Sequence, residues 1–141
     1  MPSGPFTSQS RIGASTVAKA ALLLLSCLYL LGAAGAFTVA GKGGVEFQLR
    51  RKLLVHGFCH ALVSIPCVTA AALGLARRRA ADVSAAVALG VVTLFAFRAI
   101  LSWRSTAFHI YLLLEPLVVL PCAAVIFWKL AQPNLAGNGK Q

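Results

Sequence analysis

Four long apolar runs, separated by short polar segments, dominate the pattern along the chain. They cover positions 18–40, 53–76, 80–103 and 107–130. A helix rises about 1.5 Å per residue, so each run is long enough to cross a hydrocarbon core of about 30 Å. The pattern therefore predicts an all-α, polytopic membrane protein, folded as an antiparallel four-transmembrane-helix bundle.

The polar segments indicate how the runs are connected. Segment 41–52 contains glycine and is polar, whereas 77–79 and 104–106 are short enough to force neighbouring helices to run in opposite directions. The predicted organisation is a flexible N-terminal tail, a transmembrane domain and a flexible C-terminal tail, at 1–17, 18–130 and 131–141. A second interpretation of the first run is a secretory signal, because Lys19 precedes Leu22–Leu25 and Ala34-Gly35-Ala36 resembles a cleavage site.

Composition narrows the protein class. Apolar residues make up 59% of the chain, charged residues 11%, and the mean hydropathy is +0.83, which one soluble core of 141 residues would not accommodate. The net charge is +10, but its lysines and arginines lie at the ends of the apolar runs, as at 50–52 and 77–79. They predict contact with lipid head groups rather than nucleic acid. The expected location is a membrane, with the mitochondrial inner membrane and the endoplasmic reticulum both compatible.

Glu115 is the most informative single residue. It is one of three acids in the chain and lies inside the fourth apolar run. Arg98 lies just across the preceding turn, and ionisable residues inside membranes usually pair, so the sequence predicts an Arg98–Glu115 pair. Its simplest role is to hold helix register. The alternative is a polar ligand pocket, with Glu115, Arg98, Tyr111 and Ser64 as candidates.

The histidines raise two further possibilities. His56 and His60 are four residues apart and therefore share one helix face, which Ser64 and Cys67 continue. In a catalytic alternative, Glu115 acts as acid or base and Arg98, His56 or His60 tunes it. A haem b alternative pairs His56 or His60 with His109 at matched depth.

No other metal site is expected. The stretch from His56 to His60 lacks the glutamate that a zinc hydrolase places between its histidines. The four cysteines show none of the paired short spacings typical of zinc sites, so the sequence predicts packing roles for them.

A family resemblance involves the third and fourth runs. Phe97-Arg98-Ala99-Ile100-Leu101-Ser102, followed by Tyr111-Leu112-Leu113-Leu114-Glu115, resembles the small DoxX-like four-helix membrane families, in which a basic residue near the end of the third span precedes an acid in the fourth. The resemblance covers residues 53–130. The span layout is also similar to that of the four-helix scaffold family of ergosterol synthesis. Both resemblances imply an all-helical bundle and leave the chemistry open.

Three functional hypotheses follow. The first is a non-enzymatic subunit or scaffold that packs with other membrane subunits, because the loops are minimal and small residues are abundant in the spans. The second is a small membrane enzyme or binding protein for an apolar lipid, isoprenoid or quinone, using Glu115. The third is a haem b membrane anchor.

Overall fold

A computed structural model describes residues 10–102 and 109–132, with side chains described for 10–98 and 115–132. These residues form helices without strands: α1 (Arg11–Ala14), α2 (Thr16–Ala40), α3 (Phe47–Leu75), α4 (Ala80–Ser102) and α5 (His109–Ala131). The all-helical prediction is confirmed for this part of the chain. Within it, three segments are long and apolar enough to cross a membrane, namely α2, α3 and the part of α4 from Ala80 to Arg98.

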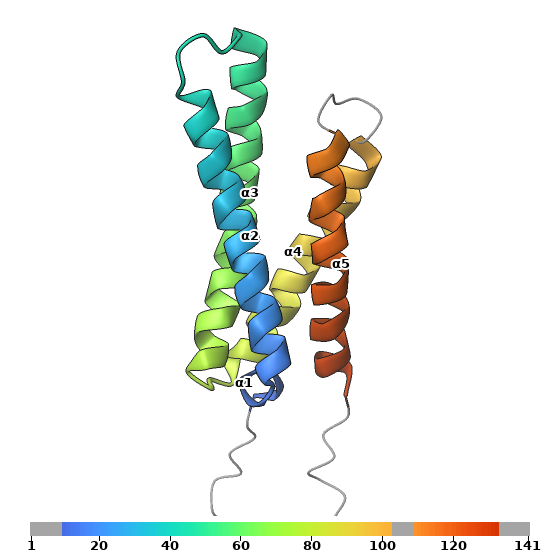
Figure 1. Cartoon of the computed structure of the whole chain (residues 1–141). Helices are drawn as coiled ribbons and strands as arrows, with labels where there is room; N and C mark the ends of the chain where they lie inside the picture. Colours follow the sequence, from blue (N-terminus) through green and yellow to red (C-terminus); the bar gives the residue numbers. More distant parts are fainter. Residues whose placement is uncertain (1–9, 103–108, 133–141) are drawn as a thin grey trace, which may run out of the picture.

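The four long helices pack in a cyclic order. Helix α2 lies along α3, and α4 lies beside α5 (Figure 1). Contacts of α3 with α4 and of α5 with α2 complete the order. The shared core is made of small and aliphatic side chains, among them Leu22, Leu25, Val92, Val119 and Ile126. Large apolar side chains such as Leu31, Leu94 and Leu117 remain more than two thirds exposed on the outside. Such a surface suits lipid rather than water.

Helix α3 begins earlier than the apolar pattern predicts. It starts at Phe47, not near position 53, and it continues unbroken past Pro66. The extra first turns contain Gln48, Arg50 and Lys52, which are polar but favour helix. The apolar pattern therefore predicted the position of the second run correctly. The start of α3 depends instead on the helix propensity of the polar residues before that run.

The short helix α1 closes one end of the molecule. Its N-cap is Ser10, whose hydroxyl accepts a hydrogen bond from the Gly13 amide at 3.0 Å. The Ile12 side chain is fully buried. Residues 10–17 are thus helical or capping residues, which differs from the flexible tail expected over 1–17. Residues 1–9 and 133–141 of the expected tails lie outside the described part of the chain.

Asp82, in the first turn of α4, holds α1 in place. Its Oδ1 accepts hydrogen bonds from the Ser10 hydroxyl at 2.7 Å and from the Ile12 amide at 3.0 Å. Its Oδ2 accepts one from the Arg11 amide at 3.0 Å. The Arg11 side chain also donates to the Leu130 carbonyl of α5. One carboxylate therefore satisfies amides at the start of α1 that have no partner within that helix.

The turn between α3 and α4 fits closely under α1. Arg77 adopts a left-handed conformation with φ of 53°, and the Arg78 amide donates to the Leu73 carbonyl at 3.0 Å, which ends α3 tightly. A Cβ at Gly13 would lie 3.0 Å from the Arg77 Cα. Glycine at position 13 lets α1 approach this turn. The other predicted tight turn, 104–106, lies outside the described residues.

Candidate functional site

A cluster of polar and aromatic side chains lies in the interior, with one member from each long helix. They are Tyr29 of α2, His60 of α3, Phe95 of α4 and Glu115 of α5. Tyr29 is fully buried, and His60 and Glu115 are only 5% and 7% exposed. We call Tyr29, His60, Phe95 and Glu115 the central cluster. Its ionisable members lie within otherwise apolar helices, where such residues usually mark a functional site.

His60 is held by contacts on several sides. Its Nδ1 lies 3.1 Å from the carbonyl oxygen of His56, one turn earlier in α3. A carbonyl only accepts hydrogen bonds, so this contact requires Nδ1 to carry the hydrogen. The opposite ring nitrogen, Nε2, therefore faces the site, 3.7 Å from Glu115 Oε2.

Aromatic rings enclose His60. The ring centroid of Tyr29 lies 5.4 Å from that of His60, and the Phe95 centroid lies 5.2 Å away with the planes at 89°. Tyr29 and Phe95 also contact each other edge to face at 5.9 Å. These distances and tilts are those of favourable aromatic pairs. The rings fix the direction in which His60 points.

Gly32 makes room for this arrangement on α2. A Cβ added at Gly32 would lie 2.6 Å from His60 Cδ2, which is closer than any real contact of this kind. The imidazole edge therefore packs directly on the backbone of α2. Any larger residue at position 32 would displace the His60 ring.

Two buried polar atoms of the central cluster lack a hydrogen-bond partner among the described residues. They are the Tyr29 hydroxyl and Glu115 Oε1. The Tyr29 hydroxyl and the Glu115 carboxylate nevertheless interact as a side-chain hydrogen-bonding pair of poor geometry. Buried groups of this kind are rare in folded proteins and call for an explanation.

The structure brings together only part of the residues named from sequence. Glu115 and His60 meet, but the partner of Glu115 differs from the one expected. Arg98 lies on the exposed surface of α4 and points its Nη1 toward Cys59 Sγ, 3.7 Å away. The helix rotations place His60 against the carboxylate, so the predicted Arg98–Glu115 pair is replaced by the His60–Glu115 contact.

The remaining candidates lie near the central cluster or outside the described side chains. His56 is exposed, and its ring centroid lies 4.0 Å from that of His60. Ser64 is buried, and its hydroxyl donates to the Ala61 carbonyl at 2.7 Å, which engages it within α3. His109 and Tyr111 belong to α5, but their side chains fall outside those described.

Sequence reasoning missed Tyr29, Gly32 and Phe95. A weak signal was available for the first two, because Tyr29 is one of only two tyrosines and Gly32 follows it by one helical turn. Phe95 carries no such signal, since phenylalanine is common in apolar runs. Asp82 was missed as well, although it is one of three acids in the chain.

The geometry bears on the haem hypothesis. An iron bound to His60 Nε2 would occupy the space of the Glu115 carboxylate, because that nitrogen faces Oε2 at 3.7 Å. His60 in this arrangement therefore does not fit an axial ligand. Among the described side chains, no three or more His, Cys, Asp or Glu residues converge as metal ligands would.

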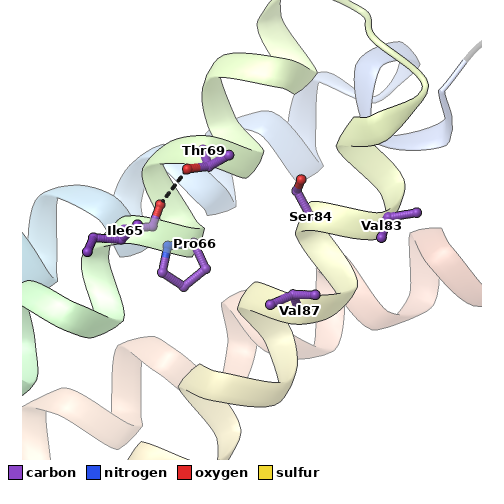
Figure 2. Close-up of a pocket in the computed structure, with 6 residues that line it drawn as sticks. All are labelled: Ile65, Pro66, Thr69, Val83, Ser84 and Val87. Carbon is purple, nitrogen blue, oxygen red and sulfur yellow. Dashed lines mark hydrogen bonds between the residues drawn. The ribbon is translucent and has the colours of Figure 1, made fainter.

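A separate groove lies on the outer surface between α3 and α4. It has a volume of about 210 Å³, and Figure 2 shows its lining: Ile65, Pro66, Thr69, Val83, Ser84 and Val87. The Thr69 hydroxyl donates to the Ile65 carbonyl at 2.8 Å, within the same helix. The lining carries no ionisable side chain, so this groove offers no acid–base chemistry.

Comparison of the chain with protein-family models, curated proteins and solved structures returns no match.

Proposed function

We propose that this chain is an integral membrane protein folded as an antiparallel four-transmembrane-helix bundle, with α5 as the fourth span. Three helices meet the length and apolarity that a span requires. Helix α5 has 23 residues, about 35 Å at the usual helical rise, and its sequence is almost entirely apolar. The cyclic packing of the four long helices and their exposed leucines support the same arrangement.

Within that bundle, the function we propose is that of a non-enzymatic subunit or scaffold in a larger membrane assembly. The observation that carries this proposal is the open space beside two glycines. Gly35 of α2 and Gly90 of α4 are exposed, and a Cβ added to either would meet no atom of the described residues within 4 Å. Ala86 is also exposed, one turn before Gly90, which gives α4 a small-xxx-small face.

Small residues at this spacing are the usual means by which helices associate in lipid. They let two backbones approach closely where no hydrophobic force drives association. Gly90 packs against no side chain in the described part of this chain, and a Cβ there would point into open space. A helix of another subunit is the occupant that this face suits.

The test is purification in mild detergent with native mass determination, on the wild type and on Gly90→Leu. We expect the wild type to retain a second polypeptide, and Gly90→Leu to lose it while staying folded. Leu94→Ile, one turn further along the same exposed face, is the matched control and should keep the partner. A wild-type chain that purifies alone, or a partner retained equally by all three proteins, would contradict the proposal.

A further inference from the structure

The outer groove between α3 and α4 changes in polarity along its length. Its two hydroxyl-bearing residues, Thr69 and Ser84, lie toward the turn that joins the two helices (Figure 2). Ile65 and Val87 lie further from that turn, and both are more than half exposed. On each helix the lining extends over about one turn, or about 6 Å. The deeper part of the groove suits a segment of hydrocarbon chain, whereas the Ser84 hydroxyl can donate to a polar group above it.

The turn beyond the hydroxyl end of the groove carries three successive arginines. Arg77, Arg78 and Arg79 are all exposed. The backbone of this turn is held firmly, because the Arg78 amide donates to the Leu73 carbonyl at 3.0 Å and α1 packs against the Arg77 Cα. Guanidinium groups match the oxygens of a phosphate in geometry as well as in charge. The turn therefore presents cationic groups close to the open end of the groove.

The surroundings of this turn are also basic. Lys19 of α2 lies beside the last turn of α3, since a Cβ at Gly74 would lie 3.6 Å from the Lys19 Cγ. Arg11 of α1 adds a further positive charge at this end of the molecule. Of the three acids in the chain, Asp82 lies nearest in sequence to the arginines, and both its oxygens accept hydrogen bonds from Ser10 and the first amides of α1. The net charge at this end is positive, which favours an anion.

The separation between the arginines and the groove matches the layers of a bilayer. Thr69 lies six residues before Leu75, where α3 ends, and Ser84 lies four residues after Ala80, where α4 begins. At the usual helical rise these separations are about 9 Å and about 6 Å. The polar layer between the hydrocarbon core and water is about 5–8 Å thick on each side of a bilayer. A lipid with its phosphate at the arginines would thus have its ester groups near Ser84 and one chain at the groove.

We propose that the Arg77–Arg79 turn and the groove between α3 and α4 together bind one anionic glycerophospholipid of the surrounding membrane. The arginines hold the phosphate, the Ser84 hydroxyl donates to an ester carbonyl, and one acyl chain packs over Ile65 and Val87. This inference rests on the membrane-spanning placement of α3 and α4 proposed above. It does not depend on the partner subunit.

The first test compares two lipids that differ in head-group charge. Native mass spectrometry of the full-length protein in mild detergent is recorded during titration with dioleoyl phosphatidylglycerol or dioleoyl phosphatidylcholine. Both lipids have the same chains and a phosphate, but only phosphatidylglycerol has a net negative charge. We expect one phosphatidylglycerol per chain, bound at least about tenfold more tightly than phosphatidylcholine, because each arginine near an anionic head group contributes about fivefold.

Charge variants locate the head group. In the double variant Arg77→Gln, Arg78→Gln we expect phosphatidylglycerol affinity to fall about 25-fold, at about fivefold for each arginine. The matched control is Arg50→Gln, Arg51→Gln, which removes the same charge from exposed positions at the opposite end of α3. This control should retain the tightly bound lipid.

A groove variant locates the acyl chain. Val87→Phe places a larger side chain in the groove, and folding should be preserved because Val87 is 54% exposed. We expect phosphatidylglycerol affinity to fall about three- to tenfold as packing contacts of the chain are lost. The matched control is Val55→Phe, the same change at a position that is 52% exposed and outside the groove. It should bind the lipid as the wild type does.

Three results would overturn the site. Equal binding of the two lipids by the wild type would mean that lipid solvates the chain without recognising charge. Equal losses in the two double arginine variants would mean that overall charge, and not this turn, attracts the lipid. A polypeptide that Val87→Phe displaces from a lipid-free wild type would mean that a partner helix fills the groove.

Alkaline carbonate extraction of membranes separates these results from a failure of the membrane-spanning placement. Release of the protein by carbonate would contradict that placement, and the lipid site with it. A protein that stays in the membrane but shows no preference for phosphatidylglycerol would overturn the lipid site alone.

Discussion

Two carboxylates in this protein have opposite surroundings. Asp82, at one end of the molecule, accepts three hydrogen bonds, from the Ser10 hydroxyl and from the amides of Arg11 and Ile12. Glu115, in the interior, contacts His60 at 3.7 Å and pairs with the Tyr29 hydroxyl only in poor geometry. Both oxygens of Asp82 accept hydrogen bonds that link α1 to α4, whereas Glu115 has no well-formed hydrogen bond among the described residues.

The comparison separates two uses of an acid, one half-buried and one buried. A carboxylate whose lone pairs are occupied by backbone amides ties segments together, and it has little capacity left for a ligand. A carboxylate whose partners are loosely placed contributes less to stability. Asp82 is therefore assigned a structural role, and we expect Glu115 to contribute less to stability than Asp82 does.

The largest expected contrast comes from neutralising each carboxylate. In Asp82→Asn the amide nitrogen must face the Arg11 amide or the Ile12 amide, because the two oxygens of Asp82 accept from different residues. We expect a loss of about 2–3 kcal/mol in the free energy of unfolding. Denaturation in mixed detergent micelles measures this loss, and hydrogen exchange at Arg11 and Ile12 should accelerate.

Glu115→Gln is the matched change in the central cluster. Its amide nitrogen can donate to His60 Nε2, and its oxygen remains an acceptor, so we expect a loss below about 1 kcal/mol. A loss equal to that of Asp82→Asn would mean that His60 and Glu115 form an ion pair with strong coupling. The proposed difference between the contributions of Asp82 and Glu115 to stability would then be wrong.

A second, smaller contrast compares two glycines of α2. In Gly32→Ala the new methyl group collides with the His60 ring, and we expect a net loss of about 1–2 kcal/mol. In Gly35→Ala the methyl group meets open space, so the better helix propensity of alanine leaves stability unchanged or raises it by up to about 1 kcal/mol. Unfolding of the two variants under identical conditions measures the difference. Equal losses would show that His60 does not pack on α2.

The smallest contrast removes one hydroxyl from each region. Ser10→Ala loses a hydrogen bond to Asp82 and the cap on the Gly13 amide, and should cost about 1 kcal/mol. Tyr29→Phe removes a hydroxyl that pairs with Glu115 only in poor geometry, and should change stability by less than about 0.5 kcal/mol. Thermal unfolding of both variants in the same detergent is the measurement. A larger loss for Tyr29→Phe than for Ser10→Ala would reverse the comparison.

Much of the fold was predictable because helix length and apolarity are local properties. The expected ranges 18–40 and 80–103 lie within two residues of α2 and α4 as observed. The first turns of α3 were not predictable from apolar runs, since they are polar. Helix α1 was missed because Arg11–Ala14 is too short for any periodic pattern, and Asp82, about 70 residues away in sequence, supplies its hydrogen bonds.

The sequence predicted that Glu115 would lie in a polar cluster, but it did not predict which residue would contact the carboxylate. Glu115 was identifiable because an acid inside an apolar run needs a partner. Choosing that partner requires the rotation of each helix about its axis, which depends on how Gly32 lets His60 approach α2. Arg98 is close in sequence, but it lies on an exposed face and contacts Cys59. Local spacing alone does not contain this information.

The attachment of Arg11 to the Leu130 carbonyl has a consequence for biosynthesis. Arg11 emerges from the ribosome before any of the long helices, yet its partner Leu130 lies at the end of α5, the last of them in the described part of the chain. The residues of α1 can therefore complete this contact only after the segments up to Leu130 have been synthesised and inserted.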